Sequence, residues 1–265
     1  MMFVGFVKRF KLLLNLICLL GVLSLVSCAK KVKNNEDCSF DELKANTASY
    51  IDKNRKDLAI DALEKMVENY SDKPEITDYR LKLANLYFEK GEYEPAYTCF
   101  KKFYKLNPSD LQADFANYRG ILCKFHQTFG PNRDMTNVLK TVKKCEKYLT
   151  SSDKNSKFKK EVKDVLYTCE KMLIDHEVFV YDFYIRRGKL QSAQSRIDYL
   201  KENFVKKHKD LEPQILYLEI KLAHNQKNKE LETQKLQALE NKFGNSHYVA
   251  MAQNLGSKIR DNFLF

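Results

Sequence analysis

Residues that could carry out catalysis or bind a metal are few and far apart in this 265-residue sequence. His176-Glu177 is not followed by the second histidine of a zinc-protease motif, and we find neither a phosphate-binding glycine loop nor a nucleophile elbow. The five histidines are scattered along the chain, at His126, His176, His208, His224 and His247. The sequence therefore predicts a protein that is not an enzyme and that has no metal site.

One cysteine, Cys28, stands in a more specific setting, at the end of an apolar segment. Basic residues precede an apolar run at residues 12–26, which is shorter than the roughly 20 residues of a bilayer-spanning helix. A secretory signal peptide has the same order of segments: basic residues first, then a short apolar run, then small residues. We predict that residues 1–27 are such a peptide. An uncleaved anchor, or an ordinary signal peptide with a chance cysteine, is the alternative.

The segment Leu25-Val26-Ser27-Cys28 resembles the bacterial lipobox, in which an aliphatic, a small or branched and a small residue precede a cysteine. This resemblance to lipoproteins implies that the Cys28 thiol receives a diacylglycerol and that the amine freed by cleavage is acylated, with no other cofactor. Acyl chains, at about 0.8 kcal/mol per buried CH2, hold a soluble domain on a membrane. Because Ala29 follows the cysteine instead of Asp, the sorting rule of enteric bacteria implies the periplasmic face of the outer membrane.

The chain is basic, with a formal net charge of +11. Basic chains often bind nucleic acid or anionic membrane surfaces. Here the lysines mostly alternate with acidic residues on helix-like stretches, as in "LKENFVKKHKDLE" at residues 200–212. This pattern favours solvated helix faces and argues against a nucleic-acid partner, with a specific polyanion site as the alternative.

Five cysteines lie beyond the predicted lipidation site, and none shows the C-x-x-C spacing of zinc or redox sites. Cys123 and Cys145 fall at positions between predicted helices, where a small apolar side chain fits. We expect buried thiols, although in an oxidising compartment one or two bridges are an alternative. The five are Cys38, Cys99, Cys123, Cys145 and Cys169.

A helical repeat is the clearest pattern in the body of the chain. Residues 79–108, "YRLKLANLYFEKGEYEPAYTCFKKFYKLNP", fit the tetratricopeptide pattern, with Arg80 in place of its tryptophan. Gly91 supplies the predicted turn between the two helices, and Pro108 ends the second helix. The matching positions are Leu83, Ala84, Tyr87, Ala96, Phe100 and Pro108.

Weaker units with the same spacing lie on both sides of this repeat. We therefore predict an all-α fold, a tetratricopeptide-repeat α-solenoid of about five helix–turn–helix units. In the fourth unit the first helix is expected to be long, from about residue 157 to 187. Residues 28–39 are predicted to be a polar, lipidated tether, followed by N-terminal repeats at 40–150 and C-terminal repeats at 151–265.

The order of these features resembles the BamD family, the tetratricopeptide lipoproteins of the outer-membrane β-barrel assembly machinery. The resemblance covers roughly residues 46–248 and is carried by the repeat above, by "RGI" at 119–121, by "RD" at 133–134 and by "FYIRRGKLQSAQSRI" at 183–197. Ile121 and Phe183 depart from the leucine and tyrosine of the family. The resemblance implies a non-enzymatic adaptor that binds the periplasmic POTRA region of BamA through the C-terminal repeats, together with other subunits of the complex.

The same resemblance implies that the N-terminal repeats receive the C-terminal signal of unfolded outer-membrane proteins. An extended peptide can lie in a groove and pair its backbone with amide groups. Ordinary solvated side chains are the alternative for each groove residue. The residues predicted to face the groove are Lys44, Ile51, Asn85, Phe88, Asn117, Ile121 and Lys124.

Two arginines, Arg187 and Arg196, match family arginines on the side that binds the partner. The guanidinium group suits a carboxylate partner through paired N–H donors. An internal salt bridge with Asp182 or Asp198 is the alternative for these arginines. For the whole protein, the alternative is a general periplasmic scaffold lipoprotein that serves another envelope complex.

Overall fold

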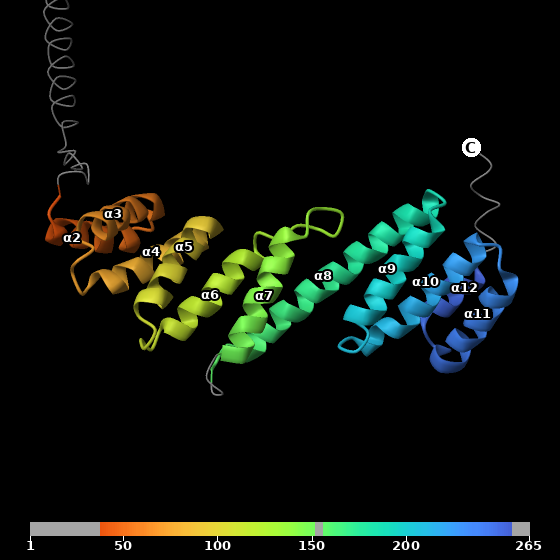
Figure 1. Ribbon diagram of the computed structural model, residues 1–265. Helices are drawn as coiled ribbons and strands as arrows, with labels where there is room; N and C mark the ends of the chain where they lie inside the picture. The colour runs from red at the N-terminus through yellow and green to blue at the C-terminus, as the bar shows by residue number, and fades with distance from the viewer. Residues whose placement is uncertain (1–37, 152–155, 256–265) are drawn as a thin grey trace, which may run out of the picture. The chain divides into compact units, whose positions relative to one another are not determined.

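The computed structural model describes residues 38–151 and 156–255, which hold eleven α-helices, one short 3-10 helix and no strand (Figure 1). The predicted all-α fold class is confirmed. No helix in these ranges is long and apolar enough to cross a bilayer. The predicted signal peptide, the lipobox with Cys28 and most of the tether lie outside the described residues.

The chain divides into two compact units, with the boundary after Tyr79 inside helix α4 (Ile76–Lys90). This boundary is defined by contacts within the chain. The predicted boundary after residue 150, which separates N-terminal repeats for client binding from C-terminal repeats for partner binding, stays a prediction. The first unit contains α2 (Phe40–Asp52) and α3 (Lys56–Asn69), which pack as a pair. Their apolar sides meet in a core that includes Leu43, Leu63 and Met66, each with no exposed surface.

Local signals set the ends of these two helices. Ser39 and Glu42 form a capping box at the start of α2, which satisfies two backbone N–H groups that the first turn leaves free. Between α2 and α3 the chain turns through Asn54, whose φ of 52° lies in the left-handed region that asparagine tolerates. The upstream repeat is thus a helical hairpin, as its spacing predicted.

The second unit continues from α4 as a series of helices, and from residue 93 onward neighbouring helices pack on one another. Gly91 ends α4 with a φ of 81°, and Gly188 ends α8 with a φ of 66°. Both φ values lie in the region that favours glycine, so the glycines allowed these two turns to be predicted from the sequence. The helices are α5 (Tyr93–Leu106), α6 (Ala113–Phe125), α7 (Thr136–Ser151), α8 (Lys159–Arg186), α9 (Leu190–Asn203), α10 (Glu212–Asn225), α11 (Lys229–Phe243) and α12 (His247–Gln253), with η2 (Lys209–Leu211) before α10.

The repeat at residues 79–108 forms the helices α4 and α5 that its pattern predicts, and Pro108 lies just beyond the end of α5. Ala84 and Ala96 have no exposed surface. Arg80, at the tryptophan position, is buried as well, with 4% exposure. Burial lowers the pKa of Arg80, and its Nε has no hydrogen-bond partner. The arginine thus occupies the buried tryptophan position but bears a desolvation cost that tryptophan would not.

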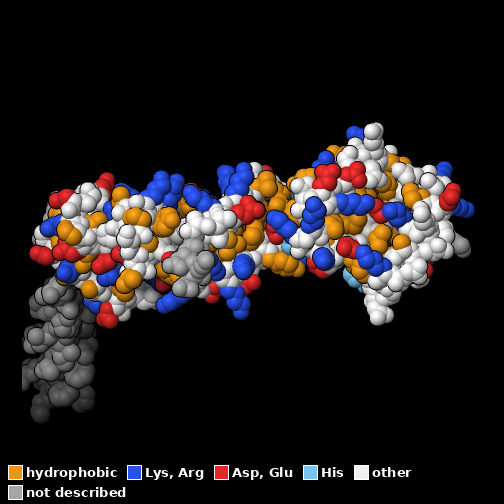
Figure 2. Space-filling view, turned by 60° about the horizontal axis from the view of Figure 1, so that its bottom comes forward, with side chains coloured by type: hydrophobic (Ala, Val, Ile, Leu, Met, Phe, Trp, Pro, Cys, Tyr) orange, Lys and Arg blue, Asp and Glu red, His pale blue; other side chains and the backbone are white. Residues whose placement is uncertain are grey.

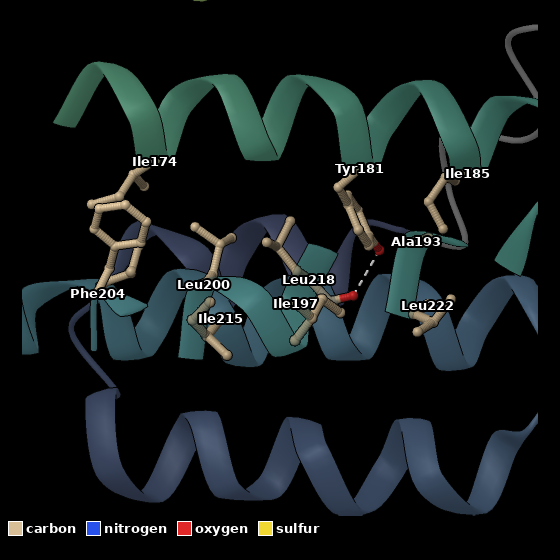
Figure 3. Packing of buried hydrophobic residues seen from close by; sticks show 11 residues of the cluster. Ile174, Tyr181, Ile185, Ala193, Ile197, Leu200, Phe204, Ile215, Leu218 and Leu222 are labelled. Atoms are coloured by element: carbon tan, nitrogen blue, oxygen red, sulfur yellow. Dashed lines mark hydrogen bonds between the residues drawn. The ribbon is translucent and has the colours of Figure 1, made fainter. Parts of the chain in front are cut away.

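The C-terminal core lies between α8, α9 and α10 (Figure 3). Tyr181 of α8 has no exposed surface, and its hydroxyl donates to the carbonyl oxygen of Leu218 on α10 at 2.7 Å. A buried hydroxyl without a partner would cost free energy, so this bond lets tyrosine fill the core. The predicted long helix is confirmed as α8, with 28 residues, whereas the short helix α12 was not predicted.

A buried charged group ties α8 to the connection before α10. Glu170 is 7% exposed and His208 is 3% exposed, with His208 Nε2 at 2.8 Å from Glu170 Oε2. Lys207 donates to the other carboxylate oxygen at 3.0 Å, and this bond raises the pKa of Lys207. Because both oxygens of the buried carboxylate have a partner, this group satisfies the condition under which a buried charge is tolerated.

Cys123, Cys145 and Cys169 are free thiols in the part of the chain that the structure describes. Cys123, Cys145 and Cys169 have no exposed surface, in agreement with the prediction of buried thiols, and burial raises the pKa of each to about 12. Cys38 is also buried, whereas Cys99 is half-buried. Since the thiolate is the reactive form, the three thiols with raised pKa should be inert in the folded chain.

We expect iodoacetamide at pH 8 to modify these three thiols very slowly in the folded protein, because only about one thiol in ten thousand is ionised four units below its pKa. Cys99 should react first, and unfolding in urea should make all sites react alike. Timed alkylation followed by peptide mass spectrometry measures the rates. Modification of Cys145 and Cys169 at the rate of Cys99 without urea would contradict this burial.

Candidate functional site

The predicted groove residues are distributed over both compact units. In the first unit, Lys44 and Ile51 are exposed on α2, and Ile51 exposes 45% of its surface. They are seven residues apart, which is close to two helical turns, so they share one side of the helix. In the second unit, α4 carries Asn85 and Phe88, both half-buried.

Phe88 is engaged inside the second unit. The guanidinium carbon of Arg119 lies 3.6 Å from the centre of the Phe88 ring, and Tyr93 and His126 contact the ring edge-on at 5.3 and 5.5 Å. His126 in turn stacks on Tyr93 at 4.7 Å. Phe88 therefore belongs to an aromatic cluster around an arginine and leaves only part of its ring open.

Arg119, the first residue of the "RGI" segment, is the centre of this cluster. Phe100 and Phe115 lie 5.7 and 5.6 Å from its guanidinium carbon. Burial lowers the pKa of Arg119, and its Nε has no hydrogen-bond partner. The faces of aromatic rings carry negative potential, so they compensate part of the desolvation of the cation. The sequence marked this arginine as a family feature but did not indicate its aromatic partners.

On the other side of α6 lies a hollow of about 160 Å³ between α5, α6 and α7. Successive residues of a helix are rotated by about 100°, so Asn117 and Ile121 point away from the side that carries Arg119. Asn117 and Ile121 both border the hollow. Its lining is completed by Tyr97, Lys101, Tyr104, Lys105, Ala116, Gly120, Lys144, Lys147, Tyr148 and Ser151.

Tyr97 is surrounded by lysines at this hollow. Lys144 donates to the Tyr97 hydroxyl at 2.6 Å, and the ammonium groups of Lys124 and Lys101 lie 4.2 and 5.7 Å from the centre of its ring. Lys124 also pairs with Glu94 and lowers the pKa of that carboxyl group. The structure therefore brings Lys124 to Tyr97, next to the hollow, and gives its charge a partner within the chain.

Ile121 requires a correction. The side chain was expected to face an open groove, but it is only 2% exposed and packs in a core cluster with Val138, Cys145 and Tyr148. The hydrophobic positions of α6 are shared between two packing neighbours, and the spacing alone did not show which side stays open. One side of α6 carries Asn117, Ile121 and Lys124. The opposite side carries Arg119, whose guanidinium group contacts Phe88.

The two predicted partner arginines differ in their surroundings. Arg196 donates to Glu177 at 3.2 Å, so its internal ion pair is formed with neither Asp182 nor Asp198. Glu177 is far from Arg196 in sequence and close only after α8 and α9 pack, so the sequence could not identify it.

Arg187, by contrast, is exposed at the end of α8. Its guanidinium carbon lies 5.6 Å from the centre of the Phe183 ring. Phe183 exposes 42% of its surface, and Phe179, one turn earlier, exposes 46%. We refer to Phe179, Phe183 and Arg187 as the α8 patch. Phe179 was not predicted, although its spacing of four residues from Phe183 is the signal that could have identified it.

The described residues contain no group of three or more His, Cys, Asp or Glu side chains that could hold a metal ion. Basic and acidic side chains are interspersed among hydrophobic ones on the face seen in Figure 2, so charge of one sign does not dominate that face. The structure thus offers two candidate sites, the hollow between α5, α6 and α7 and the α8 patch.

Comparison with known proteins gives a family match and similarities to solved structures. The family model described as YfiO, outer membrane lipoprotein, matches residues 41–227. Among solved structures, the chain is similar to the crystal structure of the TPR domain of P58(IPK), with 13% sequence identity and a TM-score of 0.40. That alignment covers 85% of this chain and 66% of the other chain. A search of curated proteins gave no match.

Replacing Arg119 with lysine tests the aromatic cluster. Arg119→Lys keeps the charge but loses the planar group that stacks on Phe88, so we expect the free energy of unfolding to fall by about 1 kcal/mol. Urea unfolding followed by circular dichroism measures the change. Arg133→Lys, at an exposed position after α6, is the matched control and should leave the midpoint unchanged. Equal midpoints for both variants would show that the stacking contributes nothing.

Proposed function

Because this chain belongs to the YfiO family of outer membrane lipoproteins, we propose that it is a non-enzymatic adaptor of the machinery that assembles outer-membrane β-barrel proteins. The observation that carries the proposal is the family match, which extends over residues 41–227 and so includes the helix pairs from α2 to α10. In this role the chain is held at the periplasmic face of the outer membrane by acyl chains on Cys28. Its repeats present surfaces to protein partners.

For the partner, we propose that the α8 patch contacts the POTRA region of BamA. Two exposed aromatic rings one helical turn apart, next to an arginine, have the composition typical of an interface hot spot. Arg187 is exposed, so a partner can reach it. Its guanidinium group can donate paired hydrogen bonds to a carboxylate of that partner. Arg196 is held by Glu177, so it supports the surface and presents less of its charge to a partner.

For the client, we propose that each unit by itself contributes contacts to the C-terminal signal of unfolded outer-membrane proteins, through side chains of α2 in the first unit and of α4 and α6 in the second. Lys44 and Ile51 offer a charge and an apolar side chain on α2, and Asn85 offers an amide on α4. Asn117 offers a second amide at the hollow. An extended peptide needs amide partners for its backbone and apolar contacts for alternate side chains, and these residue types supply both.

The proposed function is tested by purification of the complex from membranes in a mild detergent. We expect the tagged chain to recover a POTRA-containing barrel protein, and Arg187→Ala to lower the recovery severalfold because a charged contact at the α8 patch is lost. Lys189→Ala, a nearby exposed position, is the matched control and should not change it. Recovery of a different envelope complex, without such a barrel protein, would support a general scaffold and overturn the proposal.

Lipid attachment is tested separately through the cysteine. We expect Cys28→Ala to abolish incorporation of a fatty-acid probe and to leave the chain unprocessed, because the acylated thiol is the attachment point. Cys38→Ala is the control and should be labelled normally. Fluorescence of the probe in a denaturing gel gives the result, and continued labelling of Cys28→Ala would refute the lipoprotein assignment of this residue.

A further inference from the structure

The hollow between α5, α6 and α7 has an excess of lysine that the function above does not use. Four lysines border it, two on α5 and two on α7: Lys101, Lys105, Lys144 and Lys147. None of these four forms an ion pair with a carboxylate in the part of the chain that the structure describes. Lys144 instead donates to the Tyr97 hydroxyl.

The nearby carboxylates are already occupied. Glu94 pairs with Lys124. Asp114, at the start of α6, accepts hydrogen bonds from the hydroxyls of Tyr148 at 2.6 Å and Ser156 at 2.8 Å. None of the four lysines therefore has a carboxylate partner among the described residues, and an anion that entered the hollow would meet several ammonium groups and the Asn117 amide.

An apolar edge lies at the same end of the helices. The bond between Tyr148 and Asp114 places the end of α7 beside the start of α6, and thus beside the connection from α5 to α6. Leu106, the last residue of α5, exposes 60% of its surface, and Leu111 in the connection exposes 100%. Tyr104, which borders the hollow, is 38% exposed. A fully exposed leucine at the same end of the helices as lysines without a carboxylate partner has the chemistry of a surface that meets lipid headgroups.

We propose that this hollow and the α5–α6 connection bind the phosphate headgroup of an anionic phospholipid at a membrane surface. The lysines attract the phosphate as compact, strongly hydrated charges, and the leucines enter the boundary between headgroups and acyl chains. An acidic peptide would satisfy the lysines but would leave the leucines in water, so the lipid surface fits both observations. The inference rests on the proposed function in one respect, since Cys28 holds the chain at a membrane.

Lysine footprinting on the full, acylated chain tests this contact. The chain is placed in nanodiscs of phosphatidylcholine alone or with phosphatidylglycerol, and a water-soluble acetylating reagent modifies the lysines. We expect Lys101, Lys105 and Lys147 to react about fivefold more slowly with phosphatidylglycerol, the ratio that corresponds to about 1 kcal/mol per lysine at an anionic surface. The exposed Lys189 and Lys227, which lie beyond the C-terminal ends of α8 and α10, should react equally in both. Equal rates for all five lysines would overturn the proposal.

Further arms identify the source of the anion. Inorganic phosphate added to phosphatidylcholine nanodiscs should give no protection, and protection by phosphate alone would show a site for a free anion. Protection by an acidic peptide in phosphatidylcholine, with none from phosphatidylglycerol, would show a peptide site. Both outcomes would overturn the lipid proposal.

Variants test the two halves of the surface. Leu111→Asp should lower the protection of the lysines, because it removes the apolar contact and adds a like charge to the lipid. Leu139→Asp, at an exposed position on α7 that does not border the hollow, is the matched control. Circular dichroism establishes that each variant is folded. The mass of the N-terminal peptide reports acylation independently, so loss of the anchor is distinguished from loss of the headgroup contact.

Discussion

Close approach of neighbouring helices at buried alanines is the constraint on which this structure depends. Helices of 13 to 16 residues, such as α2 and α7, gain most of their stability by covering an apolar side with the next helix. Ala59, Ala84, Ala96, Ala116 and Ala193 have no exposed surface, and their small side chains let larger neighbours fill the remaining space. The hollow between α5, α6 and α7 and the α8 patch are formed by the helix sides that do not pack against a neighbouring helix.

The two sides of α6 show how this packing separates chemistry. One side buries Arg119 among aromatic rings, which compensate part of the desolvation of its charge. The other side borders a hollow where lysines have no carboxylate partner. Positive charges on the two sides of α6 therefore differ in their surroundings: aromatic rings compensate part of the desolvation of Arg119, whereas solvent hydrates the lysines of α5 and α7 at the hollow.

Local signals made much of the fold predictable, whereas the sites depend on contacts between distant residues. Gly91, Pro108 and the alanine spacing specify a hairpin within a few residues, so the helix pairs and the long α8 could be inferred. The partner of Arg196 could not, since Glu177 meets it only through the packing of α8 and α9. Ile121 was misplaced for the same reason: periodicity defines a hydrophobic side but does not identify what covers it.

The length of α8 has a mechanical consequence. Its first half, with Val162, Val165 and Cys169, belongs to one core, and its second half, with Ile174 and Tyr181, belongs to the next. A helix of 28 residues extends about 40 Å, so a single stiff rod is shared by two cores. A load applied where the second core ends would be transmitted along this rod to the first core, so the two cores are mechanically connected.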